Sequence, residues 1–176
     1  MSADPTWRLR RAVAEDAAAL SLVASATFLE TFAGLLAGTD IVAHCATKSS
    51  PAAFARWLAD PASIVTLAEA AEGAAPLAYT VLTTPDLPIE THADDIELKR
   101  IYLLERAHGS GLAGELMACA LADARALGKR RILLGVYGAN HRAQRFYEKQ
   151  GFVVVGTRQF QVGSALHDDL IYGLSL

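Results

Sequence analysis

The sequence predicts an α/β fold with a mixed sheet, and three observations lead to that class. An apolar run at residues 96–104 passes through a glycine loop into a helical stretch at 112–127 and then into a second apolar run at 131–136. A connection of this length is typical of a βαβ unit, so these two strands should be parallel. Apolar runs at 63–68 and 77–83 are joined by a short loop, as in an antiparallel hairpin. Apolar side chains also recur at helical spacing in the N-terminal third.

The N-terminal third should hold one strand and three helices. Residues 6–11 alternate polar and apolar side chains, as a short strand does. The helix that follows begins with two acidic residues, which suit a first turn, and it should end near Gly34. A second helix is expected at 40–47, and a third begins after Pro51, a residue favoured in the first helical turn.

The C-terminal part should add one helix and two strands. Asn140 can cap a helix over 140–150, which Gly151 would end. Strands are expected at 152–157 and 170–174, on either side of a polar turn region at 163–169. With no internal repeat or linker, we expect residues 1–176 to form a single domain.

Composition excludes several classes of protein. Hydrophobic residues make up 52% of the chain and charged residues 20%, which is typical of a soluble globular protein. Two cysteines without a pairing pattern favour a reducing, cytoplasmic location, and we expect no membrane span. The scattered histidines predict no metal site, and nothing indicates nucleic-acid binding. The net charge is −3, but residues 96–151 are net basic. That segment either faces a phosphate-bearing ligand or is solvated surface.

The glycine loop at Gly109 and Gly111 predicts an anion site. Loop amides can converge on one point there, and the helix that begins next adds about half a positive charge. The spacing of Gly109, Gly111 and Gly114 also fits a dinucleotide-binding pattern. That reading is disfavoured because the unit lies past mid-chain and because 136–138 lacks the acid that would bind a ribose.

A family resemblance covers nearly the whole chain. The segment Arg106-Ala107-His108-Gly109-Ser110-Gly111 resembles the Arg/Gln-x-x-Gly-x-Gly/Ala signature of the GCN5-related N-acetyltransferase (GNAT) superfamily. Residues 140–152 resemble the family's later Asn-x-x-Ala-x-x-Phe-Tyr-x-x-x-Gly-Phe block. The run 97–104 and the tail near 168–171 look like the bacterial spermidine/spermine acetyltransferase branch. The resemblance implies a GNAT fold: a mixed central sheet of about seven strands with antiparallel N-terminal strands, a splayed parallel central pair and flanking helices.

The resemblance also implies a site for acetyl-CoA, with no metal. The pyrophosphate would lie on the glycine loop, and the pantetheine arm would pair with the edge of the signature strand like an added strand. An amide near Leu103 would polarise the thioester carbonyl. Gly135 and Gly138 are consistent with close approach of a ligand. The implied cofactor-binding residues are Ile101, Tyr102, Leu103, Arg106, His108, Gly109, Ser110, Gly111, Leu112, Ala113, Asn140 and Tyr147.

Two residues are the candidates for catalysis. Tyr147 matches the tyrosine that the family places near the sulfur, and its hydroxyl would protonate the departing thiolate. The alternative is a core aromatic, but adjacent helix positions point about 100° apart, so Phe146 and Tyr147 should not face the same core. Glu97 would take the proton of the amine, or it is a surface carboxylate paired with Lys99. Phe28, Thr31 and Phe32 could line the amine site together with Glu97.

The predicted function is therefore direct acetyl transfer from acetyl-CoA to a primary amine, with a polyamine favoured. The alternatives are another acceptor, such as an amino acid, an antibiotic or a protein N-terminus, and a non-catalytic acyl-CoA-binding regulatory module. Many relatives form dimers, so a homodimer is compatible with the resemblance, and we expect the acceptor to be a small molecule.

Overall fold

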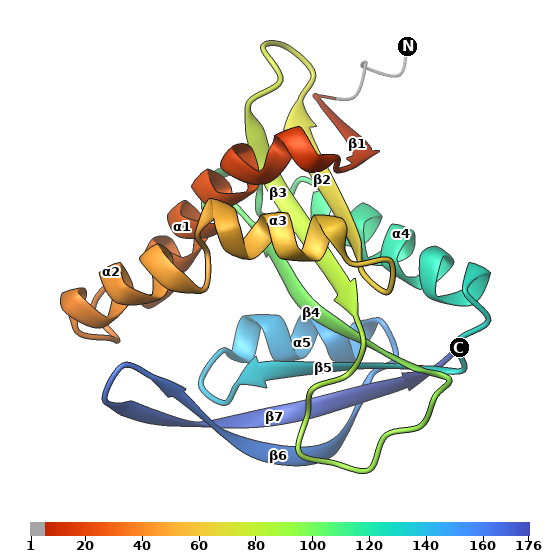
Figure 1. Ribbon diagram of the computed structural model, residues 1–176. Coiled ribbons are helices and arrows are strands. Elements are labelled where there is room, and N and C mark those ends of the chain that lie inside the picture. The colour runs from red at the N-terminus through yellow and green to blue at the C-terminus, as the bar shows by residue number, and fades with distance from the viewer. Residues whose placement is uncertain (1–5) are drawn as a thin grey trace.

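A computed structural model describes residues 6–176 and has one mixed sheet of seven strands in the order β1-β2-β3-β4-β5-β7-β6 (Figure 1). Only β4 and β5 run parallel, and all other neighbours are antiparallel. The predicted fold class is confirmed. The strands are β1 (Trp7–Arg11), β2 (Ile64–Ala70), β3 (Pro76–Thr83), β4 (Asp95–Leu103), β5 (Arg131–Tyr137), β6 (Val153–Val162) and β7 (Ala165–Ser175).

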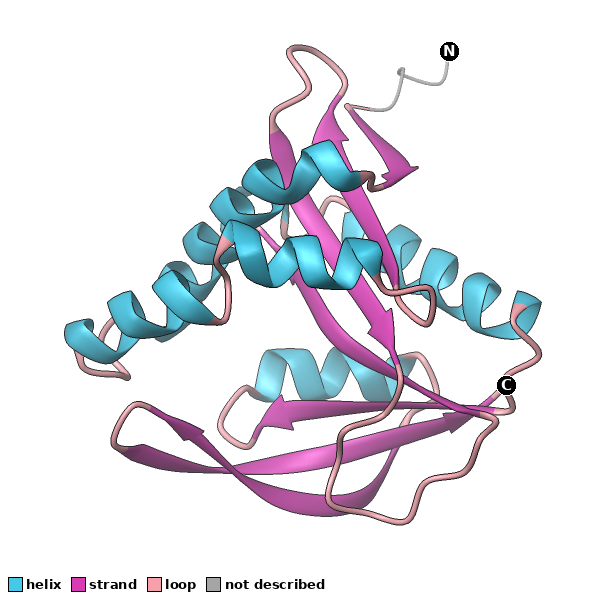
Figure 2. Cartoon of the chain, in the orientation of Figure 1, coloured by secondary structure: helices cyan, strands magenta, loops and turns pink. Residues whose placement is uncertain are grey.

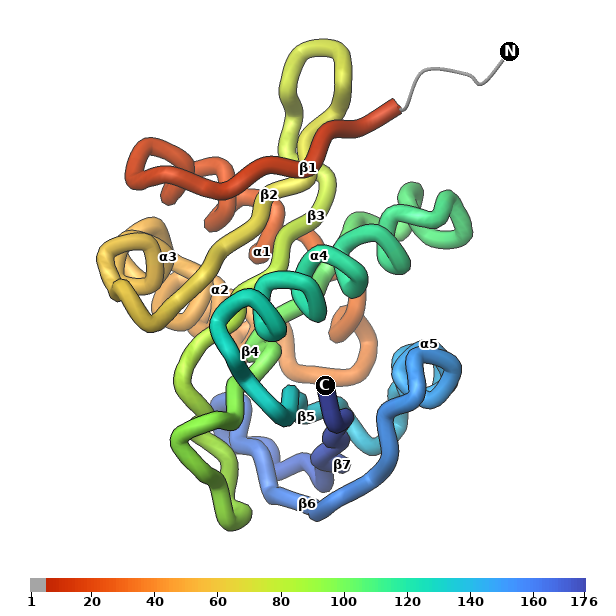
Figure 3. Tube along the Cα trace, turned by 90° about the vertical axis from the view of Figure 1, so that its right-hand side faces the viewer, coloured from red at the N-terminus to blue at the C-terminus, as the bar shows by residue number. Residues whose placement is uncertain are grey.

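Helices cover both faces of this sheet (Figures 2 and 3). They are α1 (Ala17–Phe32), α2 (Gly38–Thr47), α3 (Pro51–Ala59), α4 (Leu112–Ala126) and α5 (His141–Lys149). On one face, α1 and α3 pack on β2 and β3 through a core that includes Leu20, Phe54 and Tyr79. On the other face, α4 and α5 pack on β4, β5 and β7 through a core that includes Met117 and Ile132. Each such side chain, once buried, contributes about 1.5–3 kcal/mol to folding.

The parallel pair at the centre separates after three residues. Asp95, Ile96 and Glu97 of β4 pair with 131–133 of β5, and no pairing continues beyond them although both strands run on. The main-chain groups of β4 from Leu98 onward therefore have no strand partner on the β5 side. This is the splayed pair that the family resemblance implied.

A β-bulge in β4 decides which side chains share a face. Opposite β3, the register shifts between Val81 and Leu82, so that Glu97 pairs with Thr83 but Arg100 pairs with Val81. Directly opposite residues point to the same side of a sheet, and β3 is regular there. The extra residue, Lys99, therefore brings Arg100 and Tyr102 to the same face as Glu97. Without it, strict alternation would put Arg100 on the opposite face.

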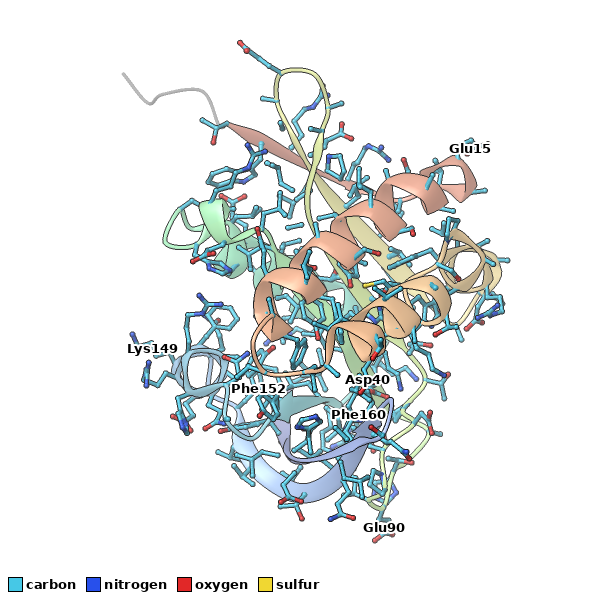
Figure 4. All side chains as sticks on the ribbon, turned by 90° about the vertical axis from the view of Figure 1, so that its left-hand side faces the viewer. Glu15, Asp40, Glu90, Lys149, Phe152 and Phe160 are labelled. Carbon is cyan, nitrogen blue, oxygen red and sulfur yellow. The ribbon has the colours of Figure 1, made fainter. Side chains whose placement is uncertain are left out.

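The C-terminal hairpin is longer than its sequence predicts. We expected a polar turn over 163–169, but β6 and β7 continue to Val162 and from Ala165, with the turn at Gly163. β6 is the edge strand, and the part of β7 before Asp169 extends past the end of β5, so polar residues alternate along both strands. In the sequence this polar alternation resembles a turn. Gly163 has a φ of +58° and lies against the side chain of Asp40 at the start of α2. Asp40 and Phe160 of β6 accordingly lie on the same side of the molecule (Figure 4).

Candidate active site

Two cavities meet at the gap between β4 and β5. The smaller, about 290 Å³, lies on the α4 and α5 side of the gap. The larger, about 540 Å³, lies on the opposite side, under α1, α2 and α3. Six residues line both cavities: Phe32, Lys99, Arg100, Tyr102, Gly135 and Tyr137. Two ligands can therefore approach one point from opposite faces of the sheet.

The glycine loop immediately precedes α4. Gly109 and Gly111 have φ of +75° and +99°, a region that glycine adopts without the cost paid by other residues, and Gly111 is the residue that precedes the helix. The Ser110 hydroxyl is already engaged, because it donates to the Ala107 carbonyl at 2.6 Å and accepts from the Leu112 amide at 3.3 Å. Loop backbone, rather than the serine side chain, is what this site offers to an anion.

Most residues of the expected cofactor set line the smaller cavity. These residues are Ile101, Tyr102, Leu103, His108, Gly109, Ala113, Asn140 and Tyr147. Four do not line it. Arg106 is exposed on a 3-10 turn, Ser110 and Gly111 lie in the loop outside the cavity, and the side chain of Leu112 is buried in the core beneath α4.

His108 is held by a residue from another element. Arg142 of α5 donates to the Nδ1 atom of His108 at 2.9 Å, and Arg142 also lines the smaller cavity. Burial, and then the charge of Arg142, lower the pKa of His108, so its imidazole is neutral and accepts this hydrogen bond. The spacing of the motifs does not predict this contact. It forms because the fold places the start of α5 beside the glycine loop.

Asn140 performs the predicted capping role. Its Oδ1 accepts from the Ala143 amide at 3.1 Å, which satisfies a free N–H of the first turn of α5. Gln144 then ties that turn to the end of β5, since its amide donates to the Gly138 carbonyl at 2.7 Å. Both bonds fix the direction in which α5 carries Tyr147 toward the gap.

Tyr147 belongs both to the core and to the smaller cavity. It is 7% exposed, and its ring lies 5.5 Å from Phe146, 5.9 Å from Phe152 and 6.1 Å from Tyr172. The expectation that Phe146 and Tyr147 do not face one core is wrong, because α5 lies flat on a broad apolar surface that reaches both. The Tyr147 hydroxyl has no hydrogen-bond partner within residues 6–176, and burial raises its pKa above the usual value.

Glu97 lines the larger cavity and is buried, with 2% exposed. One carboxylate oxygen accepts from the Asp86 amide at 2.7 Å, and the other lies 3.5 Å from the Lys99 ammonium. The pairing with Lys99 is present, but Glu97 is not a surface carboxylate. It is a buried side chain held inside the cavity by one backbone donor and one cation.

The residues expected to line the amine site divide between the cavities. Phe28 lines the larger one, Thr31 the smaller one, and Phe32 lines both. The Thr31 hydroxyl donates to the Thr27 carbonyl within α1. Phe28 stacks on His44 with ring centroids 3.8 Å apart, and burial, aided by the charges of Arg100 and Lys48, lowers the pKa of His44 to about 4.

Sequence reasoning missed the charged side chains on the floor of the larger cavity. Arg100, Arg158 and Asp169 all line it, and Arg158 pairs with Asp169 at 3.3 Å. Register explains the grouping, because Asp169 of β7 lies opposite both Arg158 of β6 and Tyr137 of β5. These residues are far apart in the chain, so no local sequence pattern indicates that they line one cavity.

Two glycines expected to allow close approach of a ligand also make room for the chain itself, and Gly135 lines both cavities. A Cβ at Gly135 would lie 2.5 Å from the Arg158 guanidinium, and one at Gly138 would lie 2.4 Å from the Asp168 carbonyl oxygen. Gly135 thus makes room for a cavity side chain, and Gly138 makes room for β7.

Within residues 6–176, no group of three or more His, Cys, Asp or Glu side chains is arranged to hold a metal ion. None of the helices in that part of the chain combines the length and the apolar character needed to cross a membrane.

This combination of a splayed parallel pair, a glycine loop before a helix and two cavities that meet at the gap defines an acyltransferase class. Residues 30–152 match the profile described as the acetyltransferase (GNAT) family. An uncharacterized N-acetyltransferase of Mycobacterium tuberculosis is 36% identical over 156 residues, which are 89% of this chain and 95% of that protein. The chain belongs to the GNAT acetyltransferase family.

Solved structures share the fold. The PaiA N-acetyltransferase of Thermoplasma acidophilum, in complex with coenzyme A, has a TM-score of 0.81 at 22% identity, covering 98% of this chain and 100% of that one. YncA of Salmonella typhimurium, solved with its cofactor acetyl-CoA, has a TM-score of 0.69 at 20% identity, covering 98% of this chain and 95% of that one.

Proposed function

We propose that this protein transfers the acetyl group of acetyl-CoA directly to a primary amine, with both substrates bound at once. The observation that carries this proposal is the meeting of two cavities at the gap between β4 and β5. Acetyl-CoA would enter from the α4 and α5 side and the amine from the α1 to α3 side. Family membership and the coenzyme A bound to two structural neighbours support the assignment of the cosubstrate.

The cosubstrate would lie along the smaller cavity. Its pyrophosphate would take the backbone amides around Gly109 and Gly111, where the N-terminus of α4 adds a favourable dipole. Its pantetheine arm would pair with the free edge of β4 at Ile101–Leu103, as an added strand does. An amide near Leu103 would then stabilise the oxyanion that forms on the thioester carbonyl.

The amine must lose a proton before it attacks. An alkyl amine has a pKa near 10.4, so its neutral form costs about 4–5 kcal/mol at pH 7. Glu97 is the buried carboxylate in the amine cavity on the same strand as the thioester site. We assign to it the acceptance of that proton, directly or through water. The Lys99 ammonium, 3.5 Å away, would compensate the negative charge of the carboxylate before it accepts that proton.

The thiolate that departs must gain a proton. The amine nitrogen forms a bond to the carbonyl carbon, the carbon–sulfur bond breaks, and the Tyr147 hydroxyl donates its proton to the sulfur. Burial raises the pKa of Tyr147, which keeps the phenol protonated at neutral pH but makes it a weaker proton donor than a free tyrosine. Tyr147 lines the smaller cavity, where the sulfur of a bound thioester would lie.

The acceptor favoured by the sequence resemblance is a polyamine. The carboxylates available to a second ammonium group are Asp86, Glu97 and Asp169, which line the larger cavity. Each already lies near a cation, either Lys99 or Arg158. Asp94 and Asp95, at the start of β4, pair with Arg130 and Arg131 and do not line it.

The first experiment measures free thiol released from acetyl-CoA with a panel of amines, alongside calorimetric binding of acetyl-CoA. Turnover with any primary amine supports the proposal, and turnover with spermidine or spermine supports the polyamine version. Tight binding without turnover on any amine would favour a non-catalytic acyl-CoA-binding module instead.

A matched pair of glycine variants tests the pyrophosphate site. Gly111→Ala and Gly73→Ala both force a positive φ on alanine, at +99° and +71°, and neither new methyl group meets another atom within 4 Å. Each should cost about 1 kcal/mol of stability. Only Gly111→Ala should weaken acetyl-CoA binding, because Gly73 lies in the β2–β3 hairpin. Equal affinities in the two variants would contradict this placement.

The role of Glu97 is tested by its pH dependence. Glu97→Gln keeps an acceptor for the Asp86 amide but removes the base. We expect kcat/KM to fall at pH 7 and to recover toward the wild-type value as the pH approaches the pKa of the amine, since the neutral amine then needs no base. A loss that is constant across pH would mean that Glu97 is structural.

A further inference from the structure

Arg100 is a half-buried cation inside the larger cavity without a carboxylate partner. Its guanidinium donates to the Ser49 hydroxyl at 3.0 Å and to the Lys48 carbonyl at 2.9 Å, and it lies 5.0 Å from the centre of the Trp57 ring. All these partners are neutral. Among residues 6–176, no carboxylate forms an ion pair with it, whereas Lys99 and Arg158 on the same floor both have one. A charge removed from water is costly when it lacks an opposite charge.

The helix beside Arg100 offsets part of that cost. Lys48 is the C-terminal cap of α2, and a cation there is favoured by the helix dipole. This contribution is equivalent to about half a charge and occupies one edge of the guanidinium. One terminal nitrogen of Arg100 donates to the Ser49 and Tyr79 hydroxyls and the other donates to the Lys48 carbonyl. One N–H of the second nitrogen and the Nε–H are left over on the edge of the guanidinium, and Arg100 lines the cavity. These bonds therefore fix the orientation of Arg100 and leave only the Nε edge of its guanidinium for a carboxylate.

The balance of charge around Arg100 is positive. Five Lys or Arg side chains line the larger cavity against three Asp or Glu side chains, although the whole chain has a net charge of −3. Two of the cations, Lys48 and Arg56, come from the roof formed by α2 and α3 and are exposed. Like Arg100, neither has a carboxylate partner in the described chain. Lys48, Arg56 and Arg100, which we call the cationic wall, therefore lack an opposite charge and repel a polycation.

The rest of the cavity is largely aromatic. Phe28 and Phe32 come from α1, Trp57 from α3, Tyr137 from β5 and Phe160 from β6. His44, which stacks on Phe28, is neutral at pH 7 because its pKa is lowered to about 4. Such a lining binds an apolar or aromatic body between the cationic wall and the buried Glu97.

We propose that the acceptor is a primary amine that also carries a carboxylate on an apolar or aromatic body, with the carboxylate bound by Arg100. This inference rests on the proposed acetyl transfer and specifies its substrate. The β-bulge at Lys99 puts Arg100 on the same face of the sheet as Glu97 and Tyr102. The carboxylate and the amine of one acceptor can therefore be bound on the same side of β4. Arg100 also lines both cavities, so a carboxylate bound by it would lie beside the point where the two ligands meet.

The test compares amines that differ only by the carboxylate. L-phenylalanine is measured against phenethylamine and L-lysine against cadaverine, with spermidine included. Each kcat/KM is corrected for the fraction of neutral amine. We expect the carboxylate-bearing member of the phenylalanine pair to be preferred about tenfold or more. If the carboxylate-free amines or spermidine turn over equally well or better, the inference is wrong, while the proposed acetyl transfer stands. If no amine turns over, both fall.

Variants then assign the preference to Arg100. A charge-assisted fork contact accounts for roughly 10- to 100-fold in affinity. Arg100→Gln should therefore raise the KM for L-phenylalanine by about that factor, and leave kcat/KM for phenethylamine within about threefold. Arg100→Lys should recover part of the loss, because the charge returns without the fork. An equal loss for both amines would mean that Arg100 acts on structure and would overturn the assignment.

A second variant keeps the test decisive if Arg100→Gln does not fold. Arg56 is exposed at the roof of the cavity, so Arg56→Gln should leave the fold intact. Arg56→Gln should lower kcat/KM for L-phenylalanine by a few fold and leave kcat/KM for phenethylamine unchanged. Acetyl-CoA affinity, measured by calorimetry, should be the same in both proteins. If Arg100→Gln does not fold and Arg56→Gln leaves the ratio of kcat/KM for L-phenylalanine to that for phenethylamine unchanged, the cationic wall does not select the acceptor.

Discussion

Replacing Tyr147 by phenylalanine separates its role in the core from its proposed role as an acid. The ring would keep its contacts with Phe146, Phe152 and Tyr172. The hydroxyl has no hydrogen-bond partner within residues 6–176, so its removal should change the free energy of unfolding by less than about 0.5 kcal/mol. A general acid contributes about 10²- to 10⁴-fold, and we expect kcat to fall by that factor.

The pH profile gives the sign of the effect. Burial raises the pKa of Tyr147, so the hydroxyl stays protonated as the pH rises through 10, and the wild-type protein should keep its acid over the whole neutral and alkaline range. The loss in Tyr147→Phe should therefore be the same from pH 7 to pH 10. The measurements are single-turnover acetyl transfer across pH and chemical denaturation.

Tyr172→Phe is the matched control in the same core. The Tyr172 hydroxyl donates to Glu148 at 3.0 Å, so its removal should cost about 1 kcal/mol and lower Tm by roughly 2–4 °C. Its kcat should not change. The two variants should thus show opposite patterns, one losing activity and the other stability. Unchanged turnover in Tyr147→Phe would refute the acid role, and a large loss of stability there would refute the account of its packing.

Three further changes follow from the geometry. As the pH falls from about 6.5 to 4, His44 takes up a proton in the unfolded chain but not in the folded one, so the free energy of unfolding should fall. Because the ring is only half-buried, we expect this fall to be about 1–2 kcal/mol. His44→Gln should flatten that part of the pH–stability curve. Gly138→Ala should cost about 1–3 kcal/mol in denaturation, since its methyl group meets the Asp168 main chain; a cost below 0.5 kcal/mol would contradict this. Asn140→Ala should cost about 1 kcal/mol by leaving the Ala143 amide without its cap, whereas Asn140→Asp should restore most of it.

Local rules were sufficient for most of the secondary structure. Pro51 at the start of α3, the cap at Asn140 and the glycine loop before α4 act over a few residues, so the sequence predicted these boundaries closely. The parallel β4–β5 pair followed from the length of the connection between the strands. The β6–β7 hairpin was missed over about half its length, because an edge strand carries polar side chains that resemble a turn.

The candidate site was predicted where it consists of consecutive residues. The glycine loop and the block that ends in Phe152 carry their own spacing, and the residues of β4 were placed along one edge. Arg158 and Asp169 were not found, since only sheet register brings them beneath α1 and α2.

The sequence by itself determined the family, the order of the elements and the glycine loop, because these depend on interactions between residues that are close in the chain. Only the tertiary structure decided which charges line the larger cavity. A single extra residue in β4 moved Arg100 onto the face of Glu97, and the pairing of four strands placed the charges of the cavity. Alternation within one strand cannot reveal a bulge, since the shift exists only relative to the neighbouring strand.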